Sequence, residues 1–176
     1  MSPTSLLHKA PERNPVTALV PMTDGEFVAF ATEAIPAYAA DKVTSGQWTK
    51  DEALELSRKS FRELLPQGRA TPNNYLFTIR DSAEQVGVGT LWIAAQDRAG
   101  KRIGYVYDIR VKPEHQRKRY ATRALLALED KVHSLGLSGI ALHVFGHNAV
   151  AHALYVKLGY QPTNISMFKA IEKPGA

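Results

Sequence analysis

The 176-residue sequence contains no cysteine, which excludes disulfides, thiolate metal ligands and a cysteine nucleophile. It also lacks an apolar run long enough to span a bilayer and a basic-then-apolar leader at its start. Hydrophobic residues at 44% and charged residues at 22% are ordinary globular values, so we expect a soluble, cytoplasmic protein. The length predicts a single domain over 16–176, preceded at 1–15 by a flexible tail with three prolines and no periodicity.

Positive charge is in surplus. Lys and Arg outnumber Asp and Glu by 22 to 17, and six of them fall within 14 positions: Arg110, Lys112, Arg117, Lys118, Arg119 and Arg123. Such a cluster predicts an anionic partner. Nucleic acid is one candidate, but the cluster is short and Tyr120 is the one aromatic residue near it. Because single-strand binders interleave cations with stacking rings, nucleic acid is the weaker interpretation.

Turn residues divide the chain into segments, and within each segment the apolar residues recur either at every second position or at helical spacing. Alternation predicts strands at 16–22, 74–80, 86–96, 102–112, 139–144 and 160–170, the last as one strand or two. Helical spacing predicts a helix capped by Asp24 that kinks or ends at Pro36, then helices over Thr49–Leu65, Tyr120–Gly136 and Asn148–Gly159. Because the strand meander precedes the crossover helices, we expect an α/β (α+β) fold. Its mixed, mostly antiparallel central sheet would have six to seven strands, with about four helices on its faces.

The segment that follows the strand at 102–112 has the pattern of a phosphate site. The strand stops at Pro113, a basic run follows, and an apolar-periodic helix begins at Tyr120. Backbone N–H groups in the loop and first helical turn, 116–122, lack intrahelical partners, and the helix dipole favours negative charge there. We therefore expect a nucleotide pyrophosphate to bind at this point. The plainer alternative is a solvated helix start.

A second constellation lies on the helix predicted over Asn148–Gly159. Asn148 and Tyr155 are seven residues apart, which places them on one face of the helix, roughly 10 Å apart along its axis. A phenol has a pKa of about 10, so it can donate a proton to a leaving thiolate. The alternative is a tyrosine that packs its ring and leaves its hydroxyl in water.

Together the two motifs resemble those of the GCN5-related N-acetyltransferase (GNAT) superfamily, in particular a bacterial subfamily of unassigned substrate. The family's pyrophosphate loop reads Gln/Arg, two residues, Gly, one residue, then Gly or Ala, and it aligns with Gln116–Ala121. The chain departs from this pattern at Arg119, which stands where the family usually has glycine. The second family pattern is matched without a gap by Asn148, Leu154, Tyr155, Gly159 and Tyr160. The similarity covers roughly 16–170.

The resemblance implies direct transfer of acetyl from acetyl-CoA to a primary amine in a ternary complex, with Tyr155 as general acid. It implies a GNAT-like sheet and a donor site that includes backbone groups of the fourth strand, the loop and one helix cap. The residues of that site are Ile109, Arg110, Val111, Gln116, Arg117, Lys118, Arg119, Tyr120, Ala121, Thr122 and Asn148. Arg119 predicts weaker binding of the donor, and it keeps open a non-catalytic CoA-sensing module as an alternative.

A base for the incoming amine is less clearly marked. Asp108, Glu33 and His143 are the candidates, since a protonated amine must lose a proton before it attacks. Tyr38 and Trp48 either line an acceptor pocket or pack in the core. We expect no metal, no membrane and a small-molecule or peptide amine as acceptor, with polyamines, antibiotics, amino acids and protein N-termini all open. A homodimer through a sheet edge or through the last strand is also open.

Overall fold

The computed structural model describes residues 17–171, so the tail predicted at 1–15 lies outside the described residues. The chain divides into two compact units, one reaching to His143 and the other starting at Val144. The single domain over 16–176 stays a prediction. No helix among the described residues is both long and apolar enough to cross a membrane.

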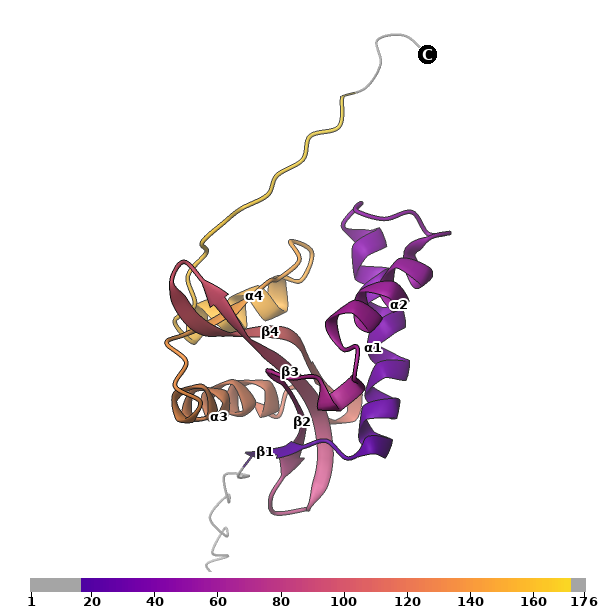
Figure 1. The fold of residues 1–176 in the computed structure, drawn as a ribbon. Coiled ribbons are helices and arrows are strands. Elements are labelled where there is room, and N and C mark those ends of the chain that lie inside the picture. The colour runs from indigo at the N-terminus through magenta and orange to yellow at the C-terminus, as the bar shows by residue number, and fades with distance from the viewer. Residues whose placement is uncertain (1–16, 172–176) are drawn as a thin grey trace, which may run out of the picture. The chain divides into compact units, whose positions relative to one another are not determined.

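The first unit is built on a sheet whose strand order follows the chain order (Figure 1). Its strands are β1 (Thr17–Pro21), β2 (Asn74–Asp81), β3 (Val86–Arg98), β4 (Lys101–Val111) and β5 (Ile140–Leu142). The first four pair antiparallel, and β5 pairs with β4 in parallel. The mixed, mostly antiparallel sheet is therefore confirmed, with five strands in the described part of the chain instead of six to seven.

The missing strand is the one predicted at 160–170. This segment of the second unit pairs with no described strand. Its apolar side chains, such as Met167 and Phe168, are almost fully exposed. Alternation alone raised the expectation of a strand, but Pro162 removes a backbone donor near its start, and apolar alternation stabilises a strand only where one face is buried.

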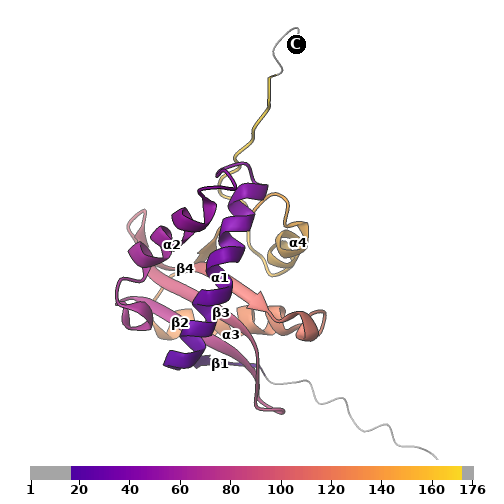
Figure 2. The ribbon, with the colours of Figure 1, turned by 90° about the vertical axis from the view of Figure 1, so that its right-hand side faces the viewer.

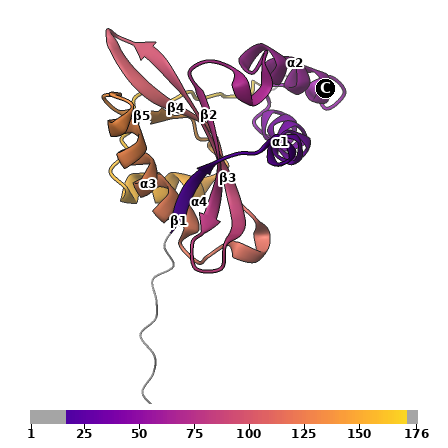
Figure 3. The same cartoon turned by 60° about the horizontal axis from the view of Figure 1, so that its bottom comes forward.

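The described part of the chain contains four α-helices, the number expected. They are α1 (Asp24–Thr44), α2 (Ala53–Leu64), α3 (Tyr120–Ser134) and, in the second unit, α4 (Ala149–Lys157). In the first unit α1 and α2 cover one face of the sheet and α3 covers the other (Figure 3). The predicted stripe of α3 is buried, with Ala124, Leu125 and Leu128 fully inaccessible. Gly136 ends this helix with φ +67°, as the sequence predicted.

The core under α1 and α2 is rich in aromatic residues. Figure 2 looks onto the face that these two helices cover. Phe30 of α1 and Phe61 of α2 pack on Trp92 of β3, with ring centroids 6.3 and 5.5 Å apart. Aromatic pairs at such distances add to the stability that burial of their area provides. These contacts fix both helices on β3.

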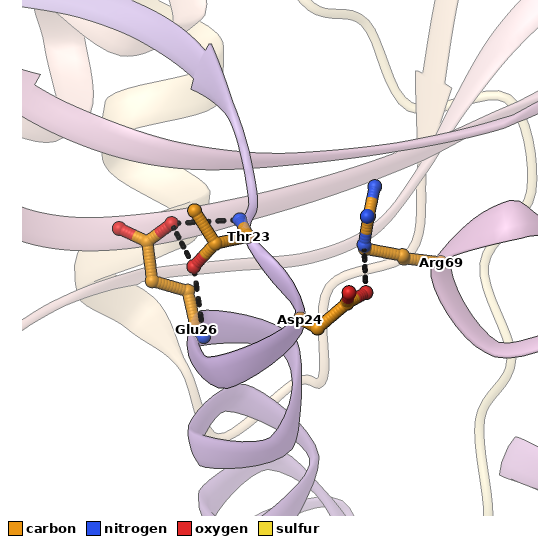
Figure 4. Close-up of polar contacts among 4 residues, drawn as sticks. All are labelled: Thr23, Asp24, Glu26 and Arg69. Atoms are coloured by element: carbon orange, nitrogen blue, oxygen red, sulfur yellow. Dashed lines mark hydrogen bonds and ion pairs between the residues drawn. The ribbon is translucent and has the colours of Figure 1, made fainter.

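The start of α1 differs from the prediction by one residue. Thr23, not Asp24, is the N-cap, and it forms a capping box with Glu26 (Figure 4). The Glu26 N–H donates to Thr23 Oγ1 at 3.3 Å, and the Thr23 N–H donates to Glu26 Oε2 at 2.8 Å. Asp24, in the first turn, instead forms an ion pair with Arg69. Two reciprocal bonds satisfy more backbone donors than a lone Asp24 cap would.

One of the two outcomes predicted for Pro36 does not occur, and the start of the second helix also differs from the prediction. Pro36 does not end α1, which continues for two more turns to Thr44. Ala34 and Ala39, on either side of the proline, are buried. Ile35 O also accepts a hydrogen bond from Ser57 Oγ of α2 at 2.7 Å, so this part of α1 is attached to its neighbours. The second helix begins at Ala53 instead of Thr49, although Glu52 still accepts the Thr49 N–H at 3.1 Å. Tertiary contacts therefore override the local breaker signal at Pro36.

Candidate active site

The predicted pyrophosphate loop has an unusual backbone conformation. Arg117 and Arg119 both adopt the left-handed region, with φ of 60° and 64°, and Arg119 is the N-cap residue of α3. Left-handed residues interspersed in a turn point successive N–H groups toward one side, which creates an anion-binding concavity. Glycine takes this conformation without strain, whereas arginine does not. The chain thus keeps a left-handed backbone at Arg119 without the glycine that would adopt it freely.

The N–H groups of this loop are unpaired. Within residues 17–171, no group accepts a hydrogen bond from the backbone N–H of any residue from Arg117 to Thr122, and the first such bond of α3 runs from Arg123 N to Arg119 O at 3.1 Å. Unpaired donors at the start of a 15-residue helix combine with the positive end of its dipole. This geometry suits a diphosphate.

The basic side chains of the cluster divide into two groups. Lys112, Arg117, Lys118 and Arg119 are exposed to solvent. Arg110 and Arg123 instead bind inside the protein: Arg110 Nε donates to Asp108 Oδ1 at 2.9 Å, and Arg123 Nε donates to Thr17 Oγ1 at 2.9 Å. Only the exposed group is placed to meet a phosphate with its charge, so Arg110 can serve a ligand through its backbone alone.

The strand before the loop has a partly open edge. β5 pairs with β4 only from Gly104 to Val106, and no described strand pairs with that edge of β4 beyond Val106. The predicted donor residues Ile109, Arg110 and Val111 lie in this stretch. The edge carries one bond of its own, from Gln116 Nε2 to Val111 O at 3.1 Å. An extended, amide-bearing ligand can add to such an edge as an extra strand.

Strand β4 also carries an irregularity beside Asp108. Trp92 of β3 pairs with Asp108, whereas the next residue, Ile93, pairs with Val106. Tyr107 is therefore an extra residue in β4, which bends the strand and redirects the side chains beside it. The Tyr107 ring stacks on Trp92 at 4.5 Å, under α1 and α2.

Of the three candidate bases, Asp108 has the most perturbed surroundings. Its side chain is only 15% exposed. Burial raises the pKa of the Asp108 carboxyl; nearby Arg110 opposes this shift and Asp41 adds to it. Its Oδ2 atom is buried and has no hydrogen-bond partner among the described residues. A buried carboxylate oxygen with an unused acceptor site can take a proton.

The other two candidates are in more solvated positions. Glu33 lies on α1 with an exposed side chain, and its contact with β4 is made by its backbone oxygen, which accepts from Arg110 Nη1 at 3.4 Å. Burial, followed by the charge of Lys42, lowers the pKa of His143 at the end of the first unit. The His143 imidazole is therefore neutral at neutral pH and able to accept a proton.

Tyr38 and Trp48 form a small aromatic cluster at the C-terminal end of α1. Their rings meet edge to face at 5.5 Å, and Lys42 Nζ lies 5.3 and 5.5 Å from the two ring centroids. Both rings are half-buried, unlike the buried Trp92 of the core. The two rings therefore lie outside the buried core.

The second unit holds the remaining predicted residues, Asn148 and Tyr155. Asn148 is the N-cap of α4, and its Oδ1 accepts the Ala151 N–H at 3.1 Å. That bond leaves the side-chain amide NH₂ as the group with which Asn148 can reach a ligand. Tyr155 is buried, with its ring 5.6 Å from that of Tyr160. Asn148 and Tyr155 lie at the cap and on the body of the same short helix, as predicted.

Sequence reasoning missed a polar network under the loop. The Tyr120 hydroxyl donates to Asp81 Oδ2 at 2.5 Å, and both residues are buried. Arg123 lies over the Tyr120 ring, 4.7 Å from its centroid. The sequence offered one weak signal: Asp81 is the acidic residue that closes a strand, and it reads simply as the first residue of a turn.

No group of three or more potential metal ligands occurs among the described residues. The groups with which this part of the chain can meet a ligand are backbone N–H groups, basic side chains, carboxyl groups and phenols.

A family model matches the chain. The model for the Acetyltransferase (GNAT) family matches residues 38–160, which include the β4 edge, the loop and α4. Two curated relatives from Bacillus subtilis (strain 168) are each named an uncharacterized N-acetyltransferase. YycN is 35% identical over 153 residues, which cover 87% of this chain and 97% of YycN. YdgE is 36% identical over 151 residues, which cover 85% of this chain and 95% of YdgE.

Solved structures show the same fold. The crystal structure of YycN, a putative acetyltransferase from Bacillus subtilis, has a TM-score of 0.84 at 34% identity and covers 89% of this chain and 99% of its own. The aminoglycoside antibiotic 6'-N-acetyltransferase AAC(6')-Ih from Acinetobacter baumannii has a TM-score of 0.54 at 14% identity, over 89% of this chain and 99% of its own. At that identity the likeness shows the fold alone.

Proposed function

We propose that this chain, which belongs to the acetyltransferase (GNAT) family, transfers an acetyl group from acetyl-CoA directly to a primary amine in a ternary complex. One observation carries the proposal: six consecutive N–H groups, Arg117 to Thr122, have no acceptor among the described residues, and they follow shortly after the stretch of β4 that no described strand covers. The loop suits the diphosphate of the donor, and the edge suits its amide-bearing arm. Ile109 to Val111 would supply the backbone groups of that edge.

Direct transfer follows from the residues available. The sequence has no cysteine that could carry the acetyl group between donor and acceptor. Bound acetyl-CoA would supply an acetyl thioester open to attack by an amine. The protein then orients the two substrates, accepts one proton and donates another. One proton is taken from the protonated amine, which frees its nitrogen to attack. As the C–N bond forms and the C–S bond breaks, a second proton passes overall from the nitrogen to the sulfur.

Asp108 is the residue we assign to the first proton. Its buried Oδ2 is unoccupied by any described donor, and Arg110 holds the other oxygen in place. Glu33 is more solvated, so it is the second choice for this role. Tyr155 is assigned to the second proton on the basis of the family pattern, with Asn148 as a further contact to the donor.

The first test is calorimetric titration of the purified protein with acetyl-CoA, 3′-dephospho-CoA and a short single-stranded DNA at two salt concentrations. We expect saturable one-to-one binding of acetyl-CoA and no binding of DNA. Salt-sensitive DNA binding without acetyl-CoA binding would instead support a nucleic-acid partner for the 110–123 cluster.

The second test is a panel of amines, with release of free CoA thiol as the readout. Spermidine, kanamycin, free amino acids and a peptide with a free N-terminus represent the open acceptor classes. Because the protein has no cysteine, it adds no thiol of its own to the signal. Binding of acetyl-CoA without thiol release from any amine would replace the transferase with a CoA-sensing role.

Tyr155→Phe tests the acid. With an acceptor from the panel, we expect kcat to fall about a hundredfold or more, since the thiolate then leaves unprotonated. The Kd for acetyl-CoA should stay the same. Unchanged kcat with an unchanged pH profile would remove Tyr155 from the mechanism.

A further inference from the structure

The conformation of the loop presents a physical problem at Arg119. Two arginines within three residues occupy the left-handed region, where an L side chain is strained. Such conformations persist only where the surrounding structure over-determines them. The bonds around the loop therefore show what holds it.

Arg123 is the first residue that stabilises the loop. Its Nη2 donates to Lys118 O at 2.9 Å, the carbonyl group that lies between the two left-handed residues. Its Nε donates to Thr17 Oγ1 of β1 at 2.9 Å. One guanidinium thus connects the middle of the loop to a strand of the sheet. A planar group with several donors is suited to such a bridge.

Tyr120 is the second residue that stabilises the loop. It follows Arg119 directly, its side chain is 5% exposed, and its hydroxyl donates to Asp81 Oδ2. Asp81 is itself fixed, because its Oδ1 accepts the N–H groups of Ala83 and Glu84 at 2.8 and 3.2 Å. The Tyr120 bond lowers the pKa of the Asp81 carboxyl, and the same bond raises the pKa of Tyr120 to about 12. The carboxylate therefore stays charged and the phenol stays protonated.

Burial of the charged Asp81 carboxylate carries a free-energy cost of desolvation. Asp81 is 2% exposed, and an apolar residue of similar size would avoid the desolvation that a buried carboxylate requires. What the carboxylate provides, and an apolar residue would not, is a directional anchor for the residue next to Arg119. The Arg123 guanidinium lies over the Tyr120 ring, so the bonds of Arg123 and the Tyr120–Asp81 bond form one network.

We propose that Asp81, Tyr120 and Arg123 are positioning residues that hold the Arg117–Arg119 loop in its donor-binding conformation before the donor arrives. A glycine at position 119 would adopt the left-handed conformation without strain. With arginine at that position, these three side chains stabilise the conformation instead. The inference rests on the proposed function, since it takes the loop to be the diphosphate site. It predicts that a glycine at this position removes the need for the network.

The experiment is a double-mutant cycle of Tyr120→Phe and Arg119→Gly, with the Kd for acetyl-CoA measured by calorimetry. We expect Tyr120→Phe to raise the Kd by about tenfold, because a charge-assisted hydrogen bond that orders the loop is lost. In the Arg119→Gly background the same change should raise the Kd by about twofold or less. Tyr75→Phe is the matched control: Tyr75 lies in β2, its hydroxyl has no hydrogen bond among the described residues, and its removal should leave the Kd unchanged.

A second readout uses the protein without ligand. Trypsin cleaves after Arg117, Lys118 and Arg119, and it needs a mobile chain to do so. We expect Tyr120→Phe to accelerate cleavage at these bonds about tenfold over wild type, and Tyr75→Phe to leave the rate unchanged. Urea unfolding of each variant shows whether the protein remains folded during both measurements.

The outcomes separate the two proposals. If the wild type fails to bind acetyl-CoA, the proposed function is wrong, and the trypsin result still decides whether the network orders the loop. If the Kd and cleavage rate of Tyr120→Phe match those of wild type while its unfolding midpoint falls, the network is structural only and the positioning role is wrong. Equal effects of Tyr120→Phe in both backgrounds would also overturn it.

Discussion

Asp108 combines a buried position with a charge that only one described side chain, Arg110, neutralises by direct contact. Because burial raises its pKa above the unfolded value, the fold favours the protonated form. Its contribution to stability is therefore present at acidic pH and is lost as the pH rises through the folded pKa. An asparagine in its place does not titrate, so it would carry no such dependence. We expect Asp108→Asn to become more stable relative to wild type as the pH rises.

Urea unfolding of wild type and Asp108→Asn at about pH 4 and about pH 7.5 measures this difference. A free-energy difference that does not change with pH would mean that the carboxyl titrates as it does in the unfolded chain. If Asp108 is also the base, the same variant loses turnover while keeping its affinity for acetyl-CoA. A variant that is folded and fully active would leave Glu33 or His143 as the base.

At the scale of elements, the start of α1 offers a direct comparison of two kinds of contact (Figure 4). Thr23 and Glu26 satisfy backbone donors reciprocally, whereas Asp24 and Arg69 form an ion pair with the Asp24 side chain 86% exposed. We expect Thr23→Ala to cost about 1 kcal/mol of unfolding free energy. Asp24→Asn should cause no measurable change, because solvent screens an exposed pair. Chemical denaturation of both variants tests the ranking, and an equal loss in both would contradict it.

The pairing of β3 with β4 depends on a glycine. A Cβ on Gly89 would lie 2.1 Å from Arg110 O, in the stretch of β4 that we assign to the donor. Gly89→Ala must therefore separate the strands, and we expect a loss of about 1–3 kcal/mol in stability and weaker acetyl-CoA binding. Gly139→Ala is the control, since a Cβ there meets nothing within 4 Å. Similar unfolding midpoints for the two variants would show that β3 and β4 adjust without strain.

For the molecule as a whole, ligand binding and stability are linked. If acetyl-CoA binds only the native state, a free concentration of about 100 times Kd should add about 2.7 kcal/mol to the free energy of unfolding. For a chain of this size that corresponds to a rise in Tm of roughly 5–10 °C. Differential scanning calorimetry with acetyl-CoA, and with an equal concentration of sulfate as the control anion, measures the shift. Equal shifts with both would indicate general anion binding at the loop.

The sequence predicted those features that depend on neighbours along the chain. The stripe of α3, the left-handed Gly136 and the meander β2–β3–β4 all follow from local periodicity and turn residues. The predictions that were wrong depend on distant partners. Helix α1 continues past Pro36, where Ala34 and Ala39 are buried and Ser57 of α2 donates to Ile35 O. Asp81 meets Tyr120 39 residues later in the chain. No local pattern encodes such pairs.

The candidate site divides in the same way. Spacing and the family resemblance predicted a site at the loop and at Asn148 and Tyr155. The N–H groups of 117–122 have no acceptor among the described residues, as expected for such a loop. The inward bonds of Arg110 and Arg123 were not foreseen, because a basic residue in a cluster gives no sign of which way its side chain turns. The direction of the Asp108 side chain also depended on the extra residue at Tyr107, which shifts the alternation.

The order of the strands has a consequence for synthesis. Since β2, β3 and β4 are neighbours both in the chain and in the sheet, we expect them to pair as they leave the ribosome, before α3 and β5 exist. The outer edge of β4 is then unpaired, and β5 later pairs with it only as far as Val106. An unpaired edge invites association with other nascent chains. The stretch of β4 beyond Val106 is therefore a place where newly made chains can associate through backbone hydrogen bonds.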